Sequence, residues 1–257
     1  MAYEVYAIKY AHHARRASEN FIGGDPHDGP MPLDYFVWLV RGEGGTFVVD
    51  TGFSAAVAAR RAREHLRCPA ESLSLLGVKR EEVRDVIVTH LHYDHVGNFD
   101  LFPAATFHLQ DLEMRYATGR HMGERFFGGA YDVEDVVGMV RRVYAGRVRF
   151  HHGDQEIAPG VAVHLIGGHT MGLQAVSVET RRGRIVLASD ASHFYANLEQ
   201  VRPFPIVWSI SDMLEGYRRV RELADSPAHI IPGHDPLVLE RYPAPSPQLK
   251  GIVARLD

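Results

Sequence analysis

The sequence predicts an α/β fold in which two β-sheets face each other and helices cover their outer sides, an αββα sandwich. Two observations predict it. First, strand-like runs rich in β-branched and aromatic residues recur in both halves of the 257-residue chain. Second, their order is strands, helix, strand and helices, followed by strands, helix and strand, which favours two sheet-containing halves with helices outside.

In the first half of the chain, short apolar runs bounded by Gly, Pro or Asp predict strands. They are "YFVWLV" at 35–40, "TFVVD" at 46–50, "DVIVTH" at 85–90 and "AATFHL" at 104–109. The short, Gly-rich "RGEGG" between the first two predicts a hairpin. The segment "SAAVAARRAREHLRC" at 54–68 begins with an N-cap serine and is rich in strong helix formers, so it predicts a helix.

The helical period appears again at 133–144 and at 211–225, which predicts two further helices. Strand-like runs followed by turns make up much of the second half: "VAVHLIGG" at 161–168, "QAVSVET" at 174–180, "RIVLASD" at 184–190 and "AHIIPGH" at 228–234. Glycines and aromatic residues between 110 and 131 predict a helix that runs into a mobile cap loop. Because no linker or repeat is visible, we expect one domain, residues 1–257, with this cap loop.

Composition and charge narrow the classes of partner. Hydrophobic residues make up 46% and charged residues 23%, which is typical of a globular chain with a sizeable core. The net charge of −4 gives no electrostatic reason to bind nucleic acid or an anionic membrane. No segment approaches the roughly 18 uninterrupted apolar residues of a membrane span, and the single Cys68 cannot form an internal disulfide. We therefore expect a cytoplasmic protein, and its oligomeric state stays open, a homodimer included.

The stretch "THLHYDHVG" at 89–97 concentrates metal-binding groups in six residues: His90, His92, Asp94 and His95. In an extended segment the spacing of His90 and His92 directs both rings to one side, where they can share an ion. A turn after them would aim Asp94 and His95 at a second ion. A lone histidine is most often a core or surface residue, but packing gives no reason to cluster four such groups, and burying them unpaired costs several kcal/mol. The motif therefore predicts a metal site.

Three further ligand candidates follow predicted strands: His169 in "LIGGHT", Asp190 in "LASDAS" and His234 in "IIPGHD". Each one alone could be a polar turn. Together with the first motif they complete a set of five histidines and two carboxylates. Such a set is large enough for two ions of four or five ligands with an open position.

These residues in this order, together with "DTG" at 50–52, resemble the metallo-β-lactamase superfamily from about residue 34 to the C-terminus. The resemblance implies an αββα sandwich with a dinuclear site, usually of zinc, at one edge of the sheets. By the pattern of the superfamily, the first ion is held by His90, His92 and His169, the second by Asp94, His95 and His234, and Asp190 bridges the two.

Within the superfamily the sequence is most similar to the N-acyl-homoserine lactonase branch, through "HLHYDH", "SDAS" at 189–192 and "GHD" at 233–235. Other branches fit less well. One group of β-lactamases uses a thiolate ligand, but Cys68 lies far from the ligand motifs. Thioesterases of the glyoxalase II type carry a long helical C-terminal domain, whereas only 23 residues (257 − 234) follow His234. Lactonases carry a tyrosine directly after "DAS", whereas this chain has His193 there and Tyr195 two residues later. Either His193 or Tyr195 is therefore expected to contact the substrate carbonyl.

The resemblance implies a hydrolase that holds two Zn²⁺ ions, or other divalent ions, per chain and opens a lactone such as an N-acyl-homoserine lactone, a quorum-quenching activity. Asp94 would act as ligand and as general acid for the ring alkoxide. Phe126 and Phe127 are interpreted as an apolar wall for an acyl tail, with no charged anchor. Alternatives are another cyclic ester, an amide or a thioester as substrate, or a non-catalytic metal-dependent sensor, against which the complete ligand set argues.

Two other features leave smaller questions. Asp50 either orients a ligand histidine or simply ends a strand before a glycine. The histidine pairs at 12–13 and 151–152 lie outside the ligand pattern, and we expect them on the surface.

Overall fold

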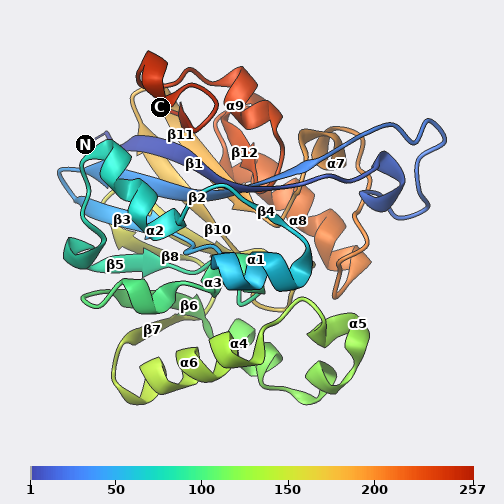
Figure 1. Ribbon diagram of the computed structural model, residues 1–257, viewed down its shortest axis with the longest axis horizontal. Helices are drawn as coiled ribbons and strands as arrows, with labels where there is room; N and C mark the ends of the chain where they lie inside the picture. Colours follow the sequence, from blue (N-terminus) through green and yellow to red (C-terminus); the bar gives the residue numbers. More distant parts are fainter. Residues whose placement is uncertain (1) are drawn as a thin grey trace.

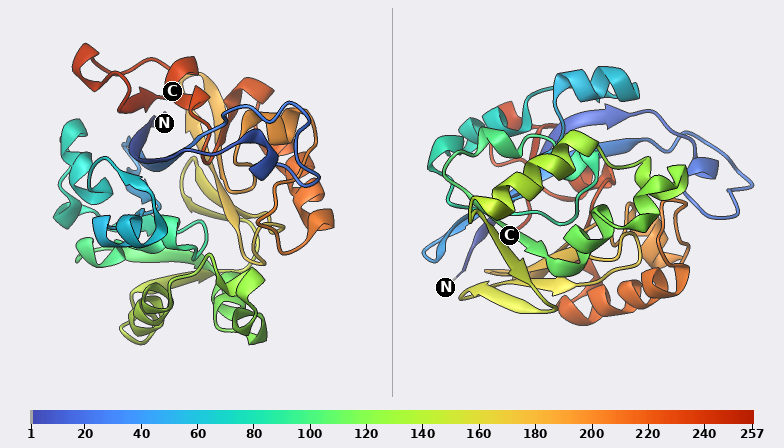
Figure 2. Two further views of the ribbon diagram at one scale, coloured as in Figure 1. Left: turned by 45° about the vertical axis from the view of Figure 1, so that its right-hand side comes forward. Right: turned by 90° about the horizontal axis from the view of Figure 1, so that it is seen from below.

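The computed structural model describes residues 2–257, so residue 1 of the predicted domain lies outside it. Two sheets face each other, and helices cover both outer sides (Figure 1). In the left view of Figure 2 the layers follow one another as teal helices, blue strands, yellow strands and orange helices. The predicted αββα sandwich is confirmed. No helix within these residues is both long and apolar enough to cross a membrane.

The first sheet has eight strands within residues 2–257. They are β1 (Glu4–His13), β2 (Leu33–Gly42), β3 (Gly45–Val49), β4 (Glu64–His65), β5 (Asp85–Ile87), β6 (Thr106–Gln110), β7 (Val148–His151) and β13 (Val253–Arg255). Their order is β13-β1-β2-β3-β5-β6-β7, with β4 paired to β1. Strands β2 and β3 form the predicted hairpin. Because β3, β5 and β6 are parallel, their carboxyl ends lie at one edge of the sheet, where the chain after β3 and after β5 enters the site.

The second sheet has five strands within the described residues and comes from the second half of the chain. In spatial order they are β12 (Ile230–Pro232), β11 (Gly183–Ser189), β10 (Gln174–Thr180), β9 (Val161–Leu165) and β8 (Gln155–Ala158). Strands β11 and β12 are parallel, so the residues that follow them emerge side by side. This pairing brings Asp190 and His234 to the same edge.

The helices are short apart from two. They are α1 (Ala55–Arg61), α2 (Pro69–Ser72), α3 (Tyr93–Val96), α4 (Asp111–Ala117), α5 (Arg125–Gly128), α6 (Val133–Tyr144), α7 (Tyr195–Glu199), α8 (Ile210–Leu223) and α9 (Leu237–Arg241). Single 3-10 turns lie at Ala17–Glu19, Leu73–Leu76, Arg80–Glu82, Phe99–Leu101, Arg120–Gly123, Pro227–His229 and Pro247–Leu249. Helix α6 spans the predicted 133–144. Helix α8 has an N-cap bond from the amide of Asp212 to Ser209.

Three hydrophobic clusters correspond to the three interfaces of a four-layer fold. The one between the sheets joins residues such as Trp38 and Val40 of the first sheet to Val176 and Leu187 of the second. A second lies between the first sheet and its helices, and Met139 of α6 belongs to it. The third lies under α8. Each sheet is thus apolar on both faces, which is why its strands read as nearly continuous apolar runs.

The structure differs from the sequence prediction in two places. The helix predicted at 54–68 ends at Arg61, because Ala62 adopts a left-handed conformation with φ of 53° and the chain then pairs with β1 as β4. Tertiary pairing here overrides the helix propensity of the segment. Strands β1, β7, β8 and β13 had no counterpart in the prediction.

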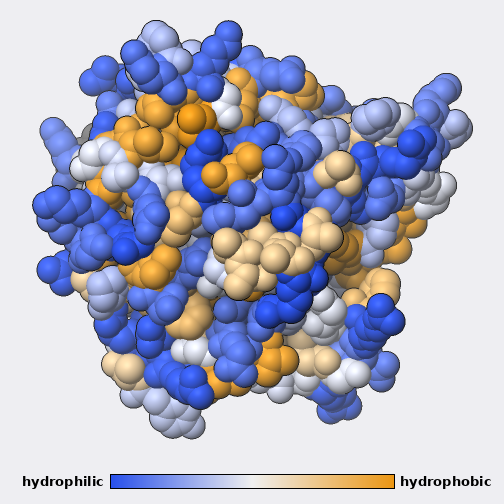
Figure 3. Space-filling model, in the orientation of Figure 1, coloured by the Kyte–Doolittle hydropathy of each residue, from blue (hydrophilic) through white to orange (hydrophobic). Residues whose placement is uncertain are grey.

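The surface around α1 shows the local sequence pattern. In Figure 3, pale orange residues lie next to dark blue ones at the place of α1, as its sequence "AAVAARR" dictates. Most of this face is hydrophilic. The chain between β1 and β2 projects from the body (Figure 1), and it is fastened to the second half by a bond from Arg202 to the carbonyl of Gly24 (2.7 Å).

Candidate metal centre

The segment after β5 brings the first ligand motif into the edge of the fold. His90 and His92 lie in extended chain, and His92 then becomes the N-cap residue of α3, which carries Asp94 and His95. The amide of His95 donates to the carbonyl of His92 (3.0 Å), which forms the turn expected between the two pairs of ligands. The three histidine side chains are buried, and Asp94 borders a pocket.

Loops of the second sheet supply the other three candidates. His169 lies between β9 and β10, Asp190 follows β11, and His234 follows β12. Gly168 has a φ of +84°, and a Cβ atom there would lie 2.5 Å from the backbone of Met213 in α8. A larger residue would therefore push the His169 loop away from α8. All seven predicted residues meet at this edge between the two sheets.

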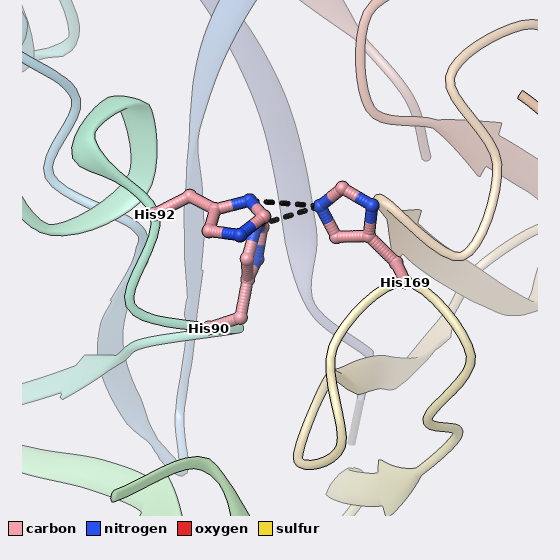
Figure 4. Close-up of side chains that lie close together, drawn as sticks. All are labelled: His90, His92 and His169. Atoms are coloured by element: carbon pink, nitrogen blue, oxygen red, sulfur yellow. Dashed lines mark hydrogen bonds between the residues drawn. The ribbon is translucent and has the colours of Figure 1, made fainter. Parts of the chain in front are cut away.

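Three histidines form the first cluster (Figure 4). His169 Nε2 lies 2.9 Å from His92 Nδ1 and 3.2 Å from His90 Nε2. Figure 4 shows the rings of His92 and His169 pointing toward each other from segments of different sheets, with His90 beside them. Their ligand atoms lie within 4.8 Å of one another, close enough to share one ion.

The second cluster combines Asp94, His95 and His234. Asp94 Oδ2 lies 3.7 Å from His95 Nε2 and 3.8 Å from His234 Nε2. Asp190 lies between the clusters: its Oδ1 is 3.3 Å from His95 Nε2 and 3.0 Å from His234 Nε2, and its Oδ2 is 3.3 Å from His169 Nε2. This position between two donor sets is the one that a bridging ligand needs.

The donor chemistry fits divalent cations. His95 Nε2 and Asp190 Oδ1 are buried and have no hydrogen-bond partner within residues 2–257. Buried polar atoms are rarely left in this way, because an unpaired one costs about 1–3 kcal/mol. Imidazole nitrogens and carboxylate oxygens that converge in this geometry suit zinc and related ions. We therefore regard the site as one whose residues fit two metal ions.

Burial and charge act differently on the two clusters. Burial lowers the pKa of His90 and His92 well below the usual value, which keeps both rings neutral, as metal ligation requires. Burial also opposes charge on His95, but Asp190, Asp50 and then Asp94 outweigh it and raise its pKa well above the usual value. The carboxylates thus stabilise positive charge near His95.

The outward-facing ring nitrogens of three ligands are held by the protein. The Nδ1 of His169 lies 2.7 Å from the carbonyl of Ile206, and that of His234 lies 3.0 Å from the carbonyl of Asp34. His95 Nδ1 lies 2.7 Å from Asp50 Oδ2. Such contacts set the tautomer and aim Nε2 at the site. Of the two readings of Asp50, the structure therefore shows the one in which it orients a histidine.

The sequence analysis missed Glu113, a fully buried carboxylate on α4. Its Oε1 accepts from the amide of Leu91 (2.9 Å) and the hydroxyl of Tyr131 (3.0 Å). Its Oε2 accepts from the hydroxyl of Thr170 (2.6 Å) and the amide of Gly172 (3.1 Å). Glu113 thus ties the His90–His92 segment to the His169 loop. A lone glutamate in a helix gives no sequence signal for this role, because its partners lie far away in the chain.

A cavity of about 440 Å³ opens above the metal candidates, with Asp94, His169, Asp190 and His234 among the residues that line it. Phe126 also lines it. Phe127 does not, because it packs against Tyr116 and Trp208. Only one of the two predicted phenylalanines therefore borders the cavity.

The two candidates for contact with a substrate carbonyl lie in different surroundings. His193 lines the cavity, stacks on Phe204 with ring centroids 3.6 Å apart, and places Nε2 2.9 Å from Asp190 Oδ2. Tyr195 lies outside the cavity lining, because it packs in the core between the sheets with the guanidinium of Arg241 3.7 Å from its ring centre. The expectation that Tyr195 reaches the substrate does not agree with this position.

The histidine pairs are less exposed than expected. His13 lines the cavity, where burial and then the charges of Arg63 and Arg15 lower its pKa to about 4. His151 is buried and stacks on His108, with ring centroids 5.2 Å apart. His152 lies on the surface as predicted, with 88% of its side chain exposed, and His12 is partly exposed at 28%.

The fold and this centre define a class of metal-dependent hydrolases built on two facing sheets. The chain belongs to the metallo-beta-lactamase superfamily, whose family model matches residues 31–238. It is 27% identical over 226 residues to a probable metallo-hydrolase of Mycobacterium tuberculosis, covering 79% of this chain and 72% of the relative. It is 28% identical over 190 residues to an N-acyl homoserine lactonase of a Bacillus species, covering 67% of this chain and 70% of the lactonase.

Solved structures agree on the fold. A quorum-quenching N-acyl homoserine lactone lactonase superposes with a TM-score of 0.76 at 23% identity, covering 91% of this chain and 93% of that chain. An N-acyl homoserine lactone hydrolase with the product N-hexanoyl-L-homoserine bound at its catalytic metal centre also has a TM-score of 0.76, at 22% identity, with 91% and 94% covered. The predicted superfamily and the predicted class of enzyme, a metal-dependent hydrolase, are confirmed.

Proposed function

We propose that this protein is a dinuclear zinc hydrolase that opens lactone rings, with N-acyl-homoserine lactones as the first candidate substrates. The observation that carries the proposal is the meeting of seven metal-binding side chains under an open cavity. The relatives support the choice of reaction, because several are N-acyl homoserine lactonases. Alternative substrates of the same site are another cyclic ester, an amide or a thioester.

We assign the ions to the clusters as the geometry groups them. His90, His92 and His169 would hold the first ion, and Asp94, His95 and His234 the second, with Asp190 between them. Divalent cations bound there supply Lewis acidity toward a carbonyl and lower the pKa of an attacking water. Nitrogen and oxygen donors without a thiolate are compatible with zinc, and also with other borderline divalent ions.

Asp94 has the geometry for proton transfer. Its side chain is 11% exposed and borders the cavity, so a substrate oxygen can reach it. Ring opening turns the lactone oxygen into an alkoxide, which must take up a proton. A carboxyl group at this place can hold that proton and deliver it, a step that typically contributes about 10²- to 10⁴-fold.

His193 is the residue that we assign to the substrate carbonyl. Since a carboxylate only accepts, the proton on the neutral His193 ring lies on Nε2, which points at Asp190 and the floor of the cavity. A substrate carbonyl oxygen beside His169 would accept a hydrogen bond from the same His193 N–H that donates to Asp190. Tyr195 packs in the core and is not among the residues that line the cavity.

We also propose that the whole chain is one domain and that residues 110–131 border its substrate cavity as a cap. Helix α4, the 3-10 turn Arg120–Gly123 and α5 make up this segment, and Phe126, Gly129 and Ala130 from it line the cavity. We place the protein in the cytoplasm, on the ground that a single cysteine cannot form an internal disulfide.

The proposal is tested by proton release from metal-replete protein, followed with a pH indicator across lactones, lactams and thioesters. We expect chelator-sensitive release of one proton per lactone ring opened. His169→Ala serves as the inactive control, and Cys68→Ser, whose change lies outside the site, as the active one. Turnover of a lactam or thioester without any lactone would favour the alternative substrates, and no turnover of any class would favour a metal-dependent sensor.

A further inference from the structure

One wall of the cavity is basic, in contrast to the expected apolar tail site without a charged anchor. Arg15, Arg61 and Arg63 line it together with His13, and Glu19 is the one acidic residue among the lining residues outside the metal candidates. The chain as a whole carries a net charge of −4, so this concentration of positive charge is local. It therefore needs its own explanation.

Arg61 is explained by the architecture. It donates to the carbonyls of Gly129 (3.1 Å) and Tyr131 (3.1 Å), and its guanidinium lies 3.9 Å from the ring centre of Tyr93. These contacts join α1 to the segment that borders the cavity. Both Nη groups of Arg61 thus have structural partners.

Arg63 is oriented by the protein but not neutralised. Its Nε donates to the hydroxyl of Tyr93 (3.2 Å), and its Nη1 contacts His13 Nε2 (3.1 Å) and the carbonyl of Arg61 (2.7 Å). Within residues 2–257 these partners include no carboxylate, and no carboxylate oxygen lies within 4.0 Å of its nitrogens. Its charge therefore faces the cavity uncompensated.

Arg15 is in a similar state at the base of the projecting chain. Its side chain is 14% exposed, and its nearest carboxylate, Glu19 Oε1, is 3.9 Å away on a side chain that is 52% exposed. Its Nη2 donates to the Glu19 carbonyl (2.5 Å), which is its one side-chain hydrogen bond within residues 2–257, although a guanidinium carries five N–H donors. Burial lowers the pKa of Arg15, as expected for a charge that has lost water without gaining a close anion.

This basic wall lies next to the metal candidates. Tyr93, which Arg63 contacts, separates His92 from Asp94 in the chain. The hydroxyl of Tyr93 lies 3.3 Å from that of Tyr35, whose ring packs edge-on against His234 with centroids 5.1 Å apart. A molecule that fills this cavity can therefore contact both the metal candidates and the arginines.

We propose that Arg15 and Arg63 bind an anionic group, a carboxylate or a phosphate, on the substrate whose ring is opened at the metal candidates. Guanidinium groups recognise both anions through paired, charge-assisted hydrogen bonds. Bound cations would offset the negative charges of Asp94 and Asp190 at the floor of the cavity. These carboxylates would then not compete with a substrate anion for the arginines. The inference rests on the proposed function, since it takes this cavity as the substrate site, and it narrows the substrate from any acyl lactone to one with an acidic arm.

Matched substrates test the inference. Three lactones are compared that differ only at the end of one acyl chain: a free carboxylate, its methyl ester and a phosphate monoester. We expect the parent protein to favour one or both acids over the ester in kcat/KM, and sodium chloride to reduce that preference. Which acid is favoured distinguishes the carboxylate from the phosphate.

Variants then locate the effect. Arg63→Met should reduce the acid-to-ester ratio of kcat/KM by about tenfold or more, the typical weight of a hydrogen bond to a charged group. Arg63→Lys should retain part of the preference for the acid. If Arg63→Met does not fold, Arg15→Met is used in its place. Arg141 is an exposed residue of α6 and provides the matched control. Arg141→Met should leave the acid-to-ester ratio unchanged. A structural role for Arg63 would lower kcat/KM for acid and ester alike and leave the ratio constant, which would overturn the inference.

Binding decides the case in which no lactone is turned over. Isothermal titration of the metal-replete parent, Arg63→Met and Arg141→Met with hexanedioate and with inorganic phosphate measures anion binding without catalysis. Affinity for either anion that falls about tenfold in Arg63→Met but not in Arg141→Met would retain the anion site while the proposed lactonase function fails. Equal affinity in all three proteins would overturn the anion site as well.

Discussion

The two clusters of candidate metal ligands are built from the same kinds of side chain, yet their surroundings differ. Around His90, His92 and His169 most near neighbours are other histidines, with Asp190 as the neighbouring carboxylate, and burial lowers the pKa of each ring. Around His95 and His234 carboxylates dominate, and despite burial both pKa values are raised. The difference teaches that burial is the main cause that keeps the donors of the first cluster neutral, whereas in the second cluster the carboxylates outweigh burial and favour positive charge.

The supports of the two clusters differ as well. Asp50 holds the ring of His95 directly. The hydrogen bonds of Glu113 within residues 2–257 go instead to backbone and hydroxyl groups, including those of the two segments that carry His90, His92 and His169. One support therefore acts on a ligand and the other on the folding of the ligand loops.

The largest effect should come from breaking the first cluster. The parent should bind about two equivalents of zinc, since seven ligands exceed the needs of one tetrahedral ion. His169→Ala should retain about one equivalent and lose turnover to the level of the chelated enzyme. Elemental analysis after dialysis measures the metal, and Cys68→Ser should match the parent. One equivalent or none in the parent would show that the clusters do not hold separate ions.

Asp94→Ala tests the second cluster. Because the change removes both a ligand and the proposed proton donor, kcat should fall by about 10²- to 10⁴-fold while KM changes far less. Steady-state kinetics on a lactone with zinc in excess measure both constants. A kcat within about tenfold of the parent would contradict proton transfer by Asp94.

His193→Ala should lower kcat by about 10²-fold if its Nε2–H stabilises the carbonyl oxygen during attack. Tyr195→Phe should leave kcat unchanged, since its side chain packs in the core between the sheets. The same kinetic assay compares the two. Full activity of His193→Ala would remove the carbonyl contact from this residue, and a loss in Tyr195→Phe would place the tyrosine back in the site.

The smallest effects should separate the two supports. Asp50→Asn should weaken zinc binding by about 10- to 100-fold, as is usual for the partner of a ligand histidine. Glu113→Gln should lower the free energy of unfolding by about 1–3 kcal/mol, because an amide group leaves a buried donor unpaired. Competition with a chromogenic chelator and urea unfolding measure the two quantities. If both variants changed zinc affinity and the free energy of unfolding by the same amounts, Asp50 and Glu113 would not have the different roles described above.

Local pattern determined much of this protein. Most of the strand segments, helix α6 and the positions of the seven candidate metal ligands follow from residue types and short spacings, because the pleat of a strand and the turn of a helix repeat within a few residues. The identity of the superfamily follows from the same motifs. These features depend on neighbours along the chain, which a sequence displays directly.

The tertiary structure alone decided the rest. Helix α1 ends at Arg61 because the next residues pair with β1, and Glu113 acquires its role only when segments 22 and 57 residues away meet it. Arg15 and Arg63 become one wall by folding, and Tyr195 moves to the core while His193 borders the cavity. Contacts of this kind join residues distant in the chain, and their free energies depend on burial and charge that exist only after the two sheets have packed.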